Sequence, residues 1–293
     1  MSRAPSADTM PDISHSAELV EINAPVSWPR GLAQMWRNLT THHHLINNFV
    51  RRDVRLRYRD SALGYFWSLF EPLLLAGVYY VLFVIIAGKP EPRYPLWIIL
   101  GVMTWGLFSK SLNDAMTCLT RNEGMIKQVY FPRELFAFTS VGSSLIITGL
   151  STLVAVPMMA MYGIGPSLGL LMVPVGLALA GLFGLGVGLG LACANVVNRD
   201  VEFFSRFLTR AGMFMSPVMW TVAMAPKTRA PWLKYLLLNP VAVPITMVRS
   251  GIEGKGLGIS AGFVTYSVCA CILSFLFGAM IFKRFEARVV KKL

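Results

Sequence analysis

Long apolar runs separated by short polar stretches dominate the sequence from Tyr65 onward. About 20 mostly apolar residues are enough for an α-helix to cross the hydrocarbon core of a membrane. By this measure the sequence predicts an all-α integral membrane protein with a six-helix transmembrane domain over residues 63–293. The six predicted spans are about Tyr65–Gly88, Tyr94–Cys118, Leu135–Tyr162, Leu168–Val197, Phe203–Met224 and Leu257–Phe282.

The residues before the first span divide into two regions. Residues 1–29 are rich in Ser, Ala, Pro and acidic side chains, and we expect a disordered cytoplasmic tail there. Residues 30–62 become helical in pattern from Leu45 onward, with apolar side chains on one half of the helical wheel and most arginines on the other. A basic amphipathic helix directly before a span is typical of an interface helix on the cytoplasmic leaflet. Its basic residues nearest the first span are Arg55, Arg57 and Arg59.

Lys and Arg residues gather on one side of the predicted spans. They lie in four stretches, over residues 51–59, 121–133, 199–210 and 283–292. The opposite side has few, including Lys89 and Arg93. Basic residues near span ends prefer the cytoplasmic side of a membrane. We therefore predict a multi-pass protein of the inner (plasma) membrane with both termini in the cytoplasm, and an even number of spans agrees with this prediction.

Two segments depart from the pattern of spans and short loops. Leu119–Arg133, on the predicted cytoplasmic side, is polar, and we predict a short helix that Asn122 caps. Ala225–Gly256, on the outer side, holds two short apolar stretches that meet at Asn239 and Pro240. Neither stretch is long enough to span, so we predict a re-entrant hairpin, which is tolerated only where free backbone groups face protein or water.

Composition and charge agree with a membrane protein. The chain is 55% hydrophobic and 14% charged, whereas soluble domains are about 45–50% apolar and about 25% charged. A net charge of +12 would suit a nucleic-acid partner, but the basic residues flank apolar runs. We attribute the charge to the membrane surface and predict no nucleic-acid binding.

The sequence has no constellation typical of a metal site or a catalytic centre. Its four cysteines lack metal-ligand spacing, and we interpret them as small buried residues. The His42–His44 triplet has no Cys or carboxylate cluster beside it, so a solvated run is favoured over a metal site. A phosphate-binding loop and a nucleophile elbow are also missing. Uphill work must therefore draw on another chain or on an ion gradient.

Charged residues inside predicted spans are candidates for function. Lys110 and Asp114 stand four residues apart in the second span, where we favour a mutually neutralised pair over a functional one. In the fourth span two G-x-x-x-G spacings, Gly184/Gly188 and Gly186/Gly190, allow close helix packing within or between subunits.

One face of the fifth span combines aromatic rings with a single cation. Such a stripe either packs in the core or lines a transport path, where rings contact sugar faces and an arginine pairs with phosphate. Four aromatic residues of the first span are further candidates for the path. The candidate path residues are Tyr65, Trp67, Tyr79, Tyr80, Phe203, Phe207, Arg210 and Phe214.

The motif LRYRDSALGYFWSLFEPL at Leu56–Leu73 resembles the N-terminal motif of ABC-2 type transporter permeases that export polysaccharides. FPRE at Phe131–Glu134, NRDV at Asn198–Val201 and LNP at Leu238–Pro240 follow in the family's order. The first motif is specific to the family. Each of the three short motifs is weak alone, and they support the resemblance only because they occur in the family's order. The resemblance covers the chain from about Leu45 to the C-terminus.

The resemblance implies a homodimer of permeases with two separate ATP-binding cassette subunits, which would hold the ATP and Mg²⁺, while this chain holds no cofactor. It implies export of a lipid-linked polysaccharide (O-antigen, cell-wall glycan, capsule or teichoic acid). It also implies a coupling helix at the cytoplasmic insert and an outer gate before the sixth span. The residues at these two positions are Asn122, Glu123, Gly124, Lys127, Arg133 and Glu134, and Asn239, Pro240 and Pro244.

Three other classes were weighed. An ABC-2 permease for a small lipid or a drug would share the same fold. An ion-coupled secondary transporter would favour inverted repeats and midplane acidic residues, of which the sequence offers only Asp114. A membrane glycosyltransferase or phosphotransferase would want acidic, metal-binding loops, which the sequence lacks.

Overall fold

The computed structural model describes residues 28–86, 88, 93–128, 132–220 and 238–289 of the 293-residue chain, and its regular elements in these ranges are all helical. The predicted tail therefore lies outside the described residues, apart from its last two. The first half of the predicted hairpin, up to residue 237, also lies outside them. Within the described ranges the all-α prediction is confirmed.

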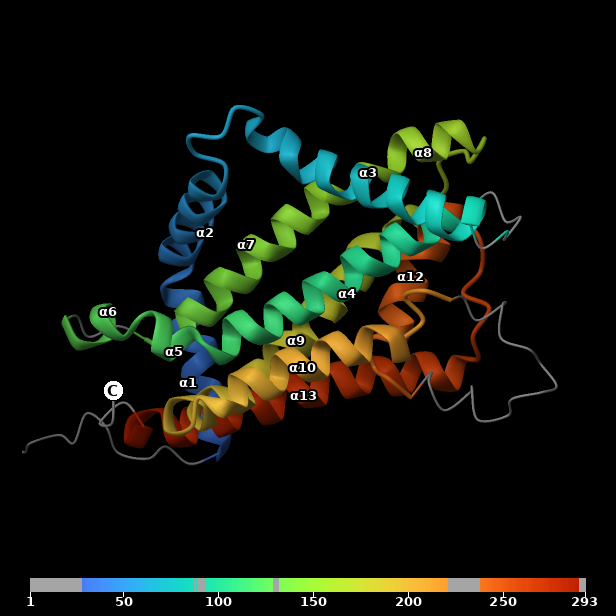
Figure 1. Ribbon diagram of the computed structural model, residues 1–293. Coiled ribbons are helices and arrows are strands. Elements are labelled where there is room, and N and C mark those ends of the chain that lie inside the picture. Colours follow the sequence, from blue (N-terminus) through green and yellow to red (C-terminus); the bar gives the residue numbers. More distant parts are fainter. Residues whose placement is uncertain (1–27, 87, 89–92, 129–131, 221–237, 290–293) are drawn as a thin grey trace, which may run out of the picture.

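Figure 1 shows how the helices are arranged. In order they are α1 (Trp28–Thr41), α2 (His43–Arg57), η1 (Gly64–Phe66), α3 (Trp67–Tyr79), the π-helix η2 (Tyr80–Ile86), α4 (Tyr94–Met116), α5 (Cys118–Arg121), α6 (Glu123–Gln128), α7 (Glu134–Thr152), α8 (Ala155–Met161), η3 (Leu168–Leu171), α9 (Met172–Val197), α10 (Asp200–Met215), α12 (Ala242–Glu253) and α13 (Ala261–Val289).

Five helical stretches of the described chain are long and apolar enough to cross a membrane. They are Gly64–Leu82, Tyr94–Met116, Glu134–Met161, Leu168–Val197 and Ala261–Val289. These stretches coincide with the first four predicted spans and the sixth.

The predicted fifth span, residues 203–224, corresponds to the shorter α10. This helix has 16 residues, which at about 1.5 Å per residue cover less than the ~30 Å hydrocarbon core. It ends because Ser216 precedes Pro217 and takes an extended conformation, as a residue before proline prefers. A count of six spans therefore stays a prediction.

Helix α9 packs against α4 on one side and against α13 on another. A Cβ atom on Gly184 would lie 2.5 Å from the Phe108 carbonyl oxygen of α4, and one on Gly188 would lie 2.5 Å from the Leu112 carbonyl oxygen. Gly186 faces α13 instead, where its Cβ would lie 2.5 Å from the backbone of Phe275. The two glycine spacings therefore serve packing within one chain.

Helices α1 and α2 lie across the end of the bundle that carries α5, α6 and the C-terminal end of α13, which we call the α6 end (Figure 1). Sequence analysis placed the start of helical structure at Leu45, whereas α1 already begins at Trp28. The apolar half of α2 is only partly covered: Val50 is buried, while Leu56 is 50% exposed. Near Val50 the absence of a side chain on Gly142 lets α2 approach α7.

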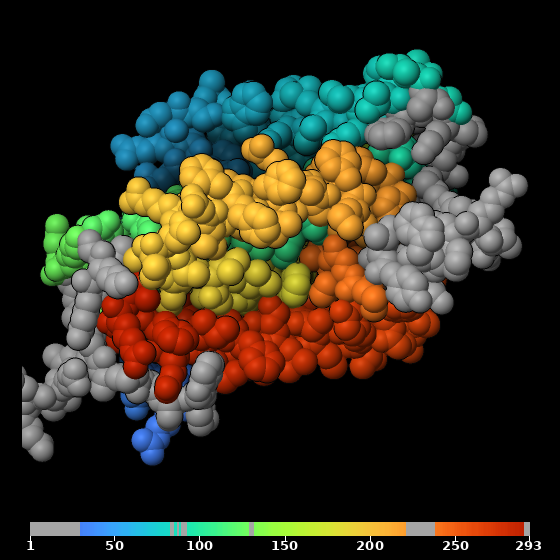
Figure 2. Space-filling model, turned by 60° about the horizontal axis from the view of Figure 1, so that its bottom comes forward, coloured from blue at the N-terminus to red at the C-terminus, as the bar shows by residue number. Residues whose placement is uncertain are grey.

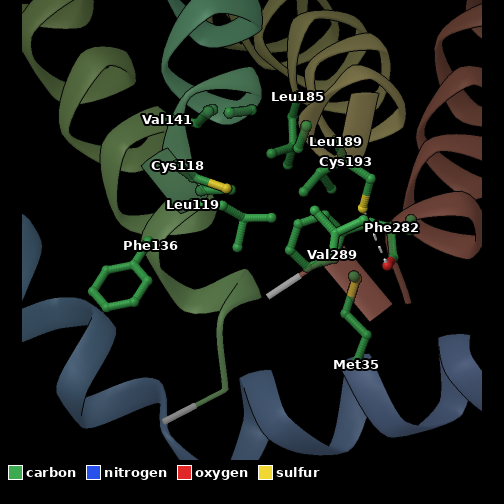
Figure 3. Close-up of a cluster of buried hydrophobic side chains, with 14 residues drawn as sticks. Met35, Cys118, Leu119, Phe136, Val141, Leu185, Leu189, Cys193, Phe282 and Val289 are labelled. Carbon is green, nitrogen blue, oxygen red and sulfur yellow. Dashed lines mark hydrogen bonds between the residues drawn. The ribbon is translucent and has the colours of Figure 1, made fainter. Parts of the chain in front are cut away.

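A cluster of buried apolar side chains lies at this α6 end (Figure 3). Met35 from α1 points toward Phe282 and Val289 of α13, and Leu119 of α5 joins the same cluster. Cys118 and Cys193 are buried in it, as predicted for small apolar residues, and Cys271 is also buried, whereas the prediction is wrong for Cys269, which is exposed on α13. The cluster therefore connects helices from both ends of the sequence.

We predict that Gly188→Leu lowers the stability of the protein by about 1–3 kcal/mol, because the new side chain would overlap the α4 backbone. Gly262→Leu is the matched control, since a Cβ there meets nothing within 4 Å. Thermal unfolding in detergent, followed by size-exclusion chromatography, measures both. Equal melting temperatures for the two variants would show that the α9–α4 contact tolerates a side chain.

Candidate functional site

A groove runs along α4 between α2 and α3 on one side and α7 on the other. It consists of two hollows, about 420 Å³ at the α6 end and about 210 Å³ further along α4. The hollows are continuous, because they share four lining residues. These are Arg57, Lys110, Ser144 and Ile147.

The wide end of the groove carries excess positive charge. Its lining holds two acidic residues, and both pair with arginines: Arg52 with Asp53 at 3.1 Å, and Arg121 with Asp114 at 2.9 Å. Arg57 and Lys110 line the groove as well, and neither has a carboxylate partner among the described residues. This end of the groove therefore suits an anionic group.

The predicted Lys110–Asp114 pair is not formed. Asp114 turns instead to Arg121, which is seven residues further along the chain. The turn at Thr117 separates α4 from α5 and brings Arg121 back beside the end of α4. Lys110 therefore forms no ion pair with Asp114, and its side chain lines the groove.

The narrower hollow combines hydroxyl groups and one carboxyl group, that of Glu71, with apolar walls. Ser144, Thr148 and Ser151 form a polar stripe along α7, at the spacing that places them on one helix face. Ser144 Oγ is buried and has no hydrogen-bond partner within the described part of the chain. Leu107 and other side chains of α4 form the facing wall. A ligand here can accept or donate hydrogen bonds on one side and make apolar contact on the other.

The four aromatic path candidates of the first span do not lie together. Tyr79 lines the narrower hollow. Tyr65 contacts the ring of Tyr58, with ring centroids 5.0 Å apart, and Trp67 meets Phe70 edge-on at 6.0 Å. Tyr80 is exposed. Of these four residues, Tyr79 is the one that lines the groove.

The aromatic stripe of α10 is exposed and does not pack inside this chain. Phe203, Phe207 and Phe214 are each about two-thirds exposed, and Arg210 is exposed beside them. The inner face of α10 is polar instead, with the Thr209 carbonyl accepting a hydrogen bond from Trp105 Nε1 at 3.0 Å. Figure 2 shows α10 (gold) on the surface between the N-terminal helices (blue) and α13 (red). The core-packing interpretation of this stripe is wrong for the single chain.

The predicted coupling segment forms a short exposed helix, α6, within Leu119–Arg133. Lys127 Nζ lies 2.6 Å from Glu123 Oε1, and this hydrogen bond and charge lower the pKa of the Glu123 carboxyl group. A Cβ on Gly124 would meet nothing within 4 Å. Asn122 Nδ2 donates to the Cys118 carbonyl at 2.8 Å, so its amide binds the preceding turn, where a cap on α6 was expected.

The last two predicted coupling residues lie at the start of α7. Arg133 is half-buried, whereas Glu134 is completely buried. Glu134 Oε1 accepts hydrogen bonds from Lys283 and Asn38, each at 2.8 Å. Glu134 is thus unavailable to another protein, which corrects its assignment as a contact residue. Periodicity alone did not reveal this, because its partners are distant in sequence.

The arginines of the predicted interface helix have different environments. Arg57 lines the groove. Arg59 lies 3.6 Å from Asp60 in an exposed ion pair. Arg55 is exposed at the end of α2.

The second half of the predicted outer gate is α12, with Asn239 before it. Asn239 Oδ1 accepts a hydrogen bond from the Val241 N–H at 3.0 Å, and its Nδ2 donates to Ser216 Oγ at 2.6 Å. Pro240 accepts a hydrogen bond from Ser267 of α13 through its carbonyl. Pro244 lies in the first turn of α12, where a helix needs no N–H donor, so it does not break this helix.

Sequence analysis missed the buried Arg249 of α12. Its guanidinium donates to the carbonyls of Trp97, Pro217 and Val218 at 2.6–2.7 Å and to that of Trp220 at 3.1 Å. Gly101 leaves room for it, because a Cβ there would lie 2.5 Å from Nη2. Arg249 thus satisfies the free backbone where α10 has ended. An arginine within the apolar run VPITMVRSGI was the available signal.

These features define a multi-pass helical membrane protein with a charged groove among its apolar helices and a polar helix outside them. Residues 44–252 match the family described as ABC-2 type transporter. The chain belongs to this family.

Curated relatives resemble most of the chain. It is 28% identical over 224 residues to the O-antigen export system permease protein RfbA of Klebsiella pneumoniae, covering 74% of this chain and 83% of that protein. The Myxococcus xanthus protein of the same name is 26% identical, covering 75% and 84%. The polysialic acid transport protein KpsM of Escherichia coli is 22% identical, covering 72% and 84%.

We predict that Arg249→Lys destabilises the protein by about 2–3 kcal/mol, because one ammonium group cannot reach four carbonyls spread around a planar guanidinium. Arg93→Lys is the matched control, since Arg93 makes a partly exposed ion pair with Glu253 at 3.8 Å, and such pairs contribute about 0–1 kcal/mol. Thermal unfolding in detergent measures the difference. A melting temperature for Arg249→Lys equal to that of the control would contradict the assigned role.

Proposed function

We propose that this protein is the membrane permease subunit of an ABC exporter for a lipid-linked polysaccharide. The polymer, carried on undecaprenyl pyrophosphate, would move from the cytoplasm to the outer side of the inner membrane. Family membership supports the transporter class, and the names of the relatives support a polysaccharide as cargo. The α6 end then faces the cytoplasm, in keeping with the Lys and Arg content of its segments.

The observation that carries the proposal is that two cations of the groove, Arg57 and Lys110, form no ion pair with any carboxylate that the structure describes. A diphosphate is costly to remove from water, and arginine and lysine offset that cost through charge-assisted hydrogen bonds. Arg57 and Lys110 stand where such a group would arrive from the α6 end. The hydroxyl stripe beyond them, with Tyr79, suits the first sugars, which combine hydroxyl groups with apolar faces.

The energy would come from other chains. This sequence has no phosphate-binding loop, so we propose that two ATP-binding cassette subunits bind ATP and Mg²⁺ and drive two copies of the permease. The exposed α6 helix is the proposed contact with those subunits. The exposed rings of α10 would then face the second copy or the polymer between the copies, and α10 would be part of the predicted fifth span.

We expect the double variant Arg57→Gln/Lys110→Gln to export about tenfold less polymer or worse, because each charge-assisted hydrogen bond contributes about 1.5–3 kcal/mol. The measurement is polymer on the surface of cells that lack their own copy of the permease, at equal permease levels in the membrane. Arg210→Gln, run in parallel, tests the earlier candidate on α10.

Two results of this experiment would count against the proposal. Failure of the wild-type chain to restore surface polymer with its ATPase subunit would refute polysaccharide export. Normal export by the double variant, together with a loss in Arg210→Gln, would move the phosphate site from the groove to α10.

We expect Gly124→Trp to leave the permease folded and inserted but to abolish coupling. The space around Gly124 is open in this chain, so a bulky side chain should disturb only a partner at α6. The ratio of ATP hydrolysis to export in the reconstituted complex measures this. Gly165→Trp is the control, because Gly165 is exposed near α8 and equally open. Unchanged coupling in Gly124→Trp would exclude α6 as the contact.

A further inference from the structure

A buried cluster of charges lies at the start of α7, next in sequence to the coupling segment, which the structure describes over residues 122–128 and 132–133. Lys283 Nζ is 2.8 Å from Glu134 Oε1 and 3.0 Å from Glu286 Oε1. The side chains of Lys283 and Glu134 are 4% and 0% exposed. Asn38 Nδ2 donates to the same Glu134 oxygen at 2.8 Å. The carboxylate of Glu134 therefore connects α1, α7 and α13. We call the cluster of Asn38, Glu134, Lys283 and Glu286 the joint.

Such a joint favours one arrangement of the three helices. Removing charges from water is unfavourable, and a buried pair compensates for it only with good geometry and further hydrogen bonds. If α7 slid relative to α13, the buried Glu134 would lose its cation and keep only the neutral Asn38, while Lys283 would keep Glu286 of its own helix. The packing of α1 is equally close, because a Cβ on Gly31 would lie 3.0 Å from Lys283 Cβ.

The other end of the coupling segment also packs against α1 and α13. Cys118 and Leu119 of α5, directly before the segment, are buried in the apolar cluster that includes Met35 of α1 and Phe282 of α13 (Figure 3). Ile126 of α6 also packs against this cluster. The segment is thus held at both ends by α1 and α13, which come from opposite ends of the sequence.

We propose that Asn38, Glu134 and Lys283 are positioning residues that fix the coupling segment to α1 and α13, so that a displacement of α6 moves these helices as one body. The proposal rests on the proposed function in one respect, namely that α6 receives the motion of an ATPase subunit. The joint itself is a property of the permease chain. The proposal predicts that a variant with a weakened ion pair still hydrolyses ATP but exports less polymer per ATP hydrolysed.

The first experiment tests the joint in the permease alone. Spin labels are placed on cysteines introduced at Met125 of α6 and Trp36 of α1, which are 40% and 71% exposed. Cys269, the exposed native cysteine, is replaced by Ser. The distance distribution between the labels is measured for the parent, for Glu134→Gln/Lys283→Met, and for Asn38→Ala. The double variant removes both charges of the pair, and Asn38→Ala leaves the pair intact should the double variant fail to fold.

The control is Lys255→Met, which removes an exposed lysine from its ion pair with Glu253 at the opposite end of the bundle. We expect a broader distribution for the double variant, a smaller broadening for Asn38→Ala and none for the control. Distributions as narrow as that of the parent in every folded variant would overturn the proposal. The same broadening in Lys255→Met would also overturn it, since the effect would not be local.

The second experiment measures ATP hydrolysed per polymer exported in the complex with the ATPase subunits. We expect this ratio to rise at least about fivefold in the double variant, the lower end of coupling between distant sites. An unchanged ratio in a variant with a broadened distribution would refute the role of the joint in transmission. Failure of the wild-type complex to export would refute the proposed function instead, and the label distances would still decide whether the joint exists.

Discussion

The close contact of α9 with α4 and α13 is the constraint on which the arrangement of the other parts depends. Gly184 and Gly188 face α4 while Gly186 faces α13, so backbone meets backbone on two sides of one helix. Apolar attraction between helices is weak inside a membrane, and close packing of small residues takes its place. Because α4 forms one wall of the groove and α13 carries Lys283, the glycines of α9 set the distance between the groove and the buried joint.

Charged residues serve two different purposes in this structure. At the joint, Lys283 is buried between two carboxylates, and this arrangement suits a residue that holds α7 and α13 in a fixed position. In the groove, Arg57 and Lys110 line an open surface without a carboxylate partner in the described part of the chain, which suits a ligand that brings its own negative charge. Both arrangements lie toward the α6 end, so a displacement of α6 would reach the joint and the groove wall together.

Backbone groups that a broken helix leaves free are satisfied by side chains from other elements. Arg249 binds three carbonyls that follow the end of α10 as well as that of Trp97 in α4. Asn239 contributes on the other side by binding Ser216. Irregular backbone is tolerated at membrane depth only where protein or water meets its hydrogen-bonding needs. A short α10 followed by a turn is therefore compatible with a position among the spans.

The sequence by itself determined the helical class, the first four and the last of the apolar helices, and the exposed polar helix α6, because these depend on the length of apolar runs and on local polar content. The end of α10 before Pro217 is also local in origin. Only the tertiary structure decided that Asp114 pairs with Arg121, that Glu134 is buried, that Arg249 binds four carbonyls, and that the rings of α10 are exposed. Each of these depends on how a helix is rotated against neighbours far away in the sequence, which the periodicity of a single helix does not specify.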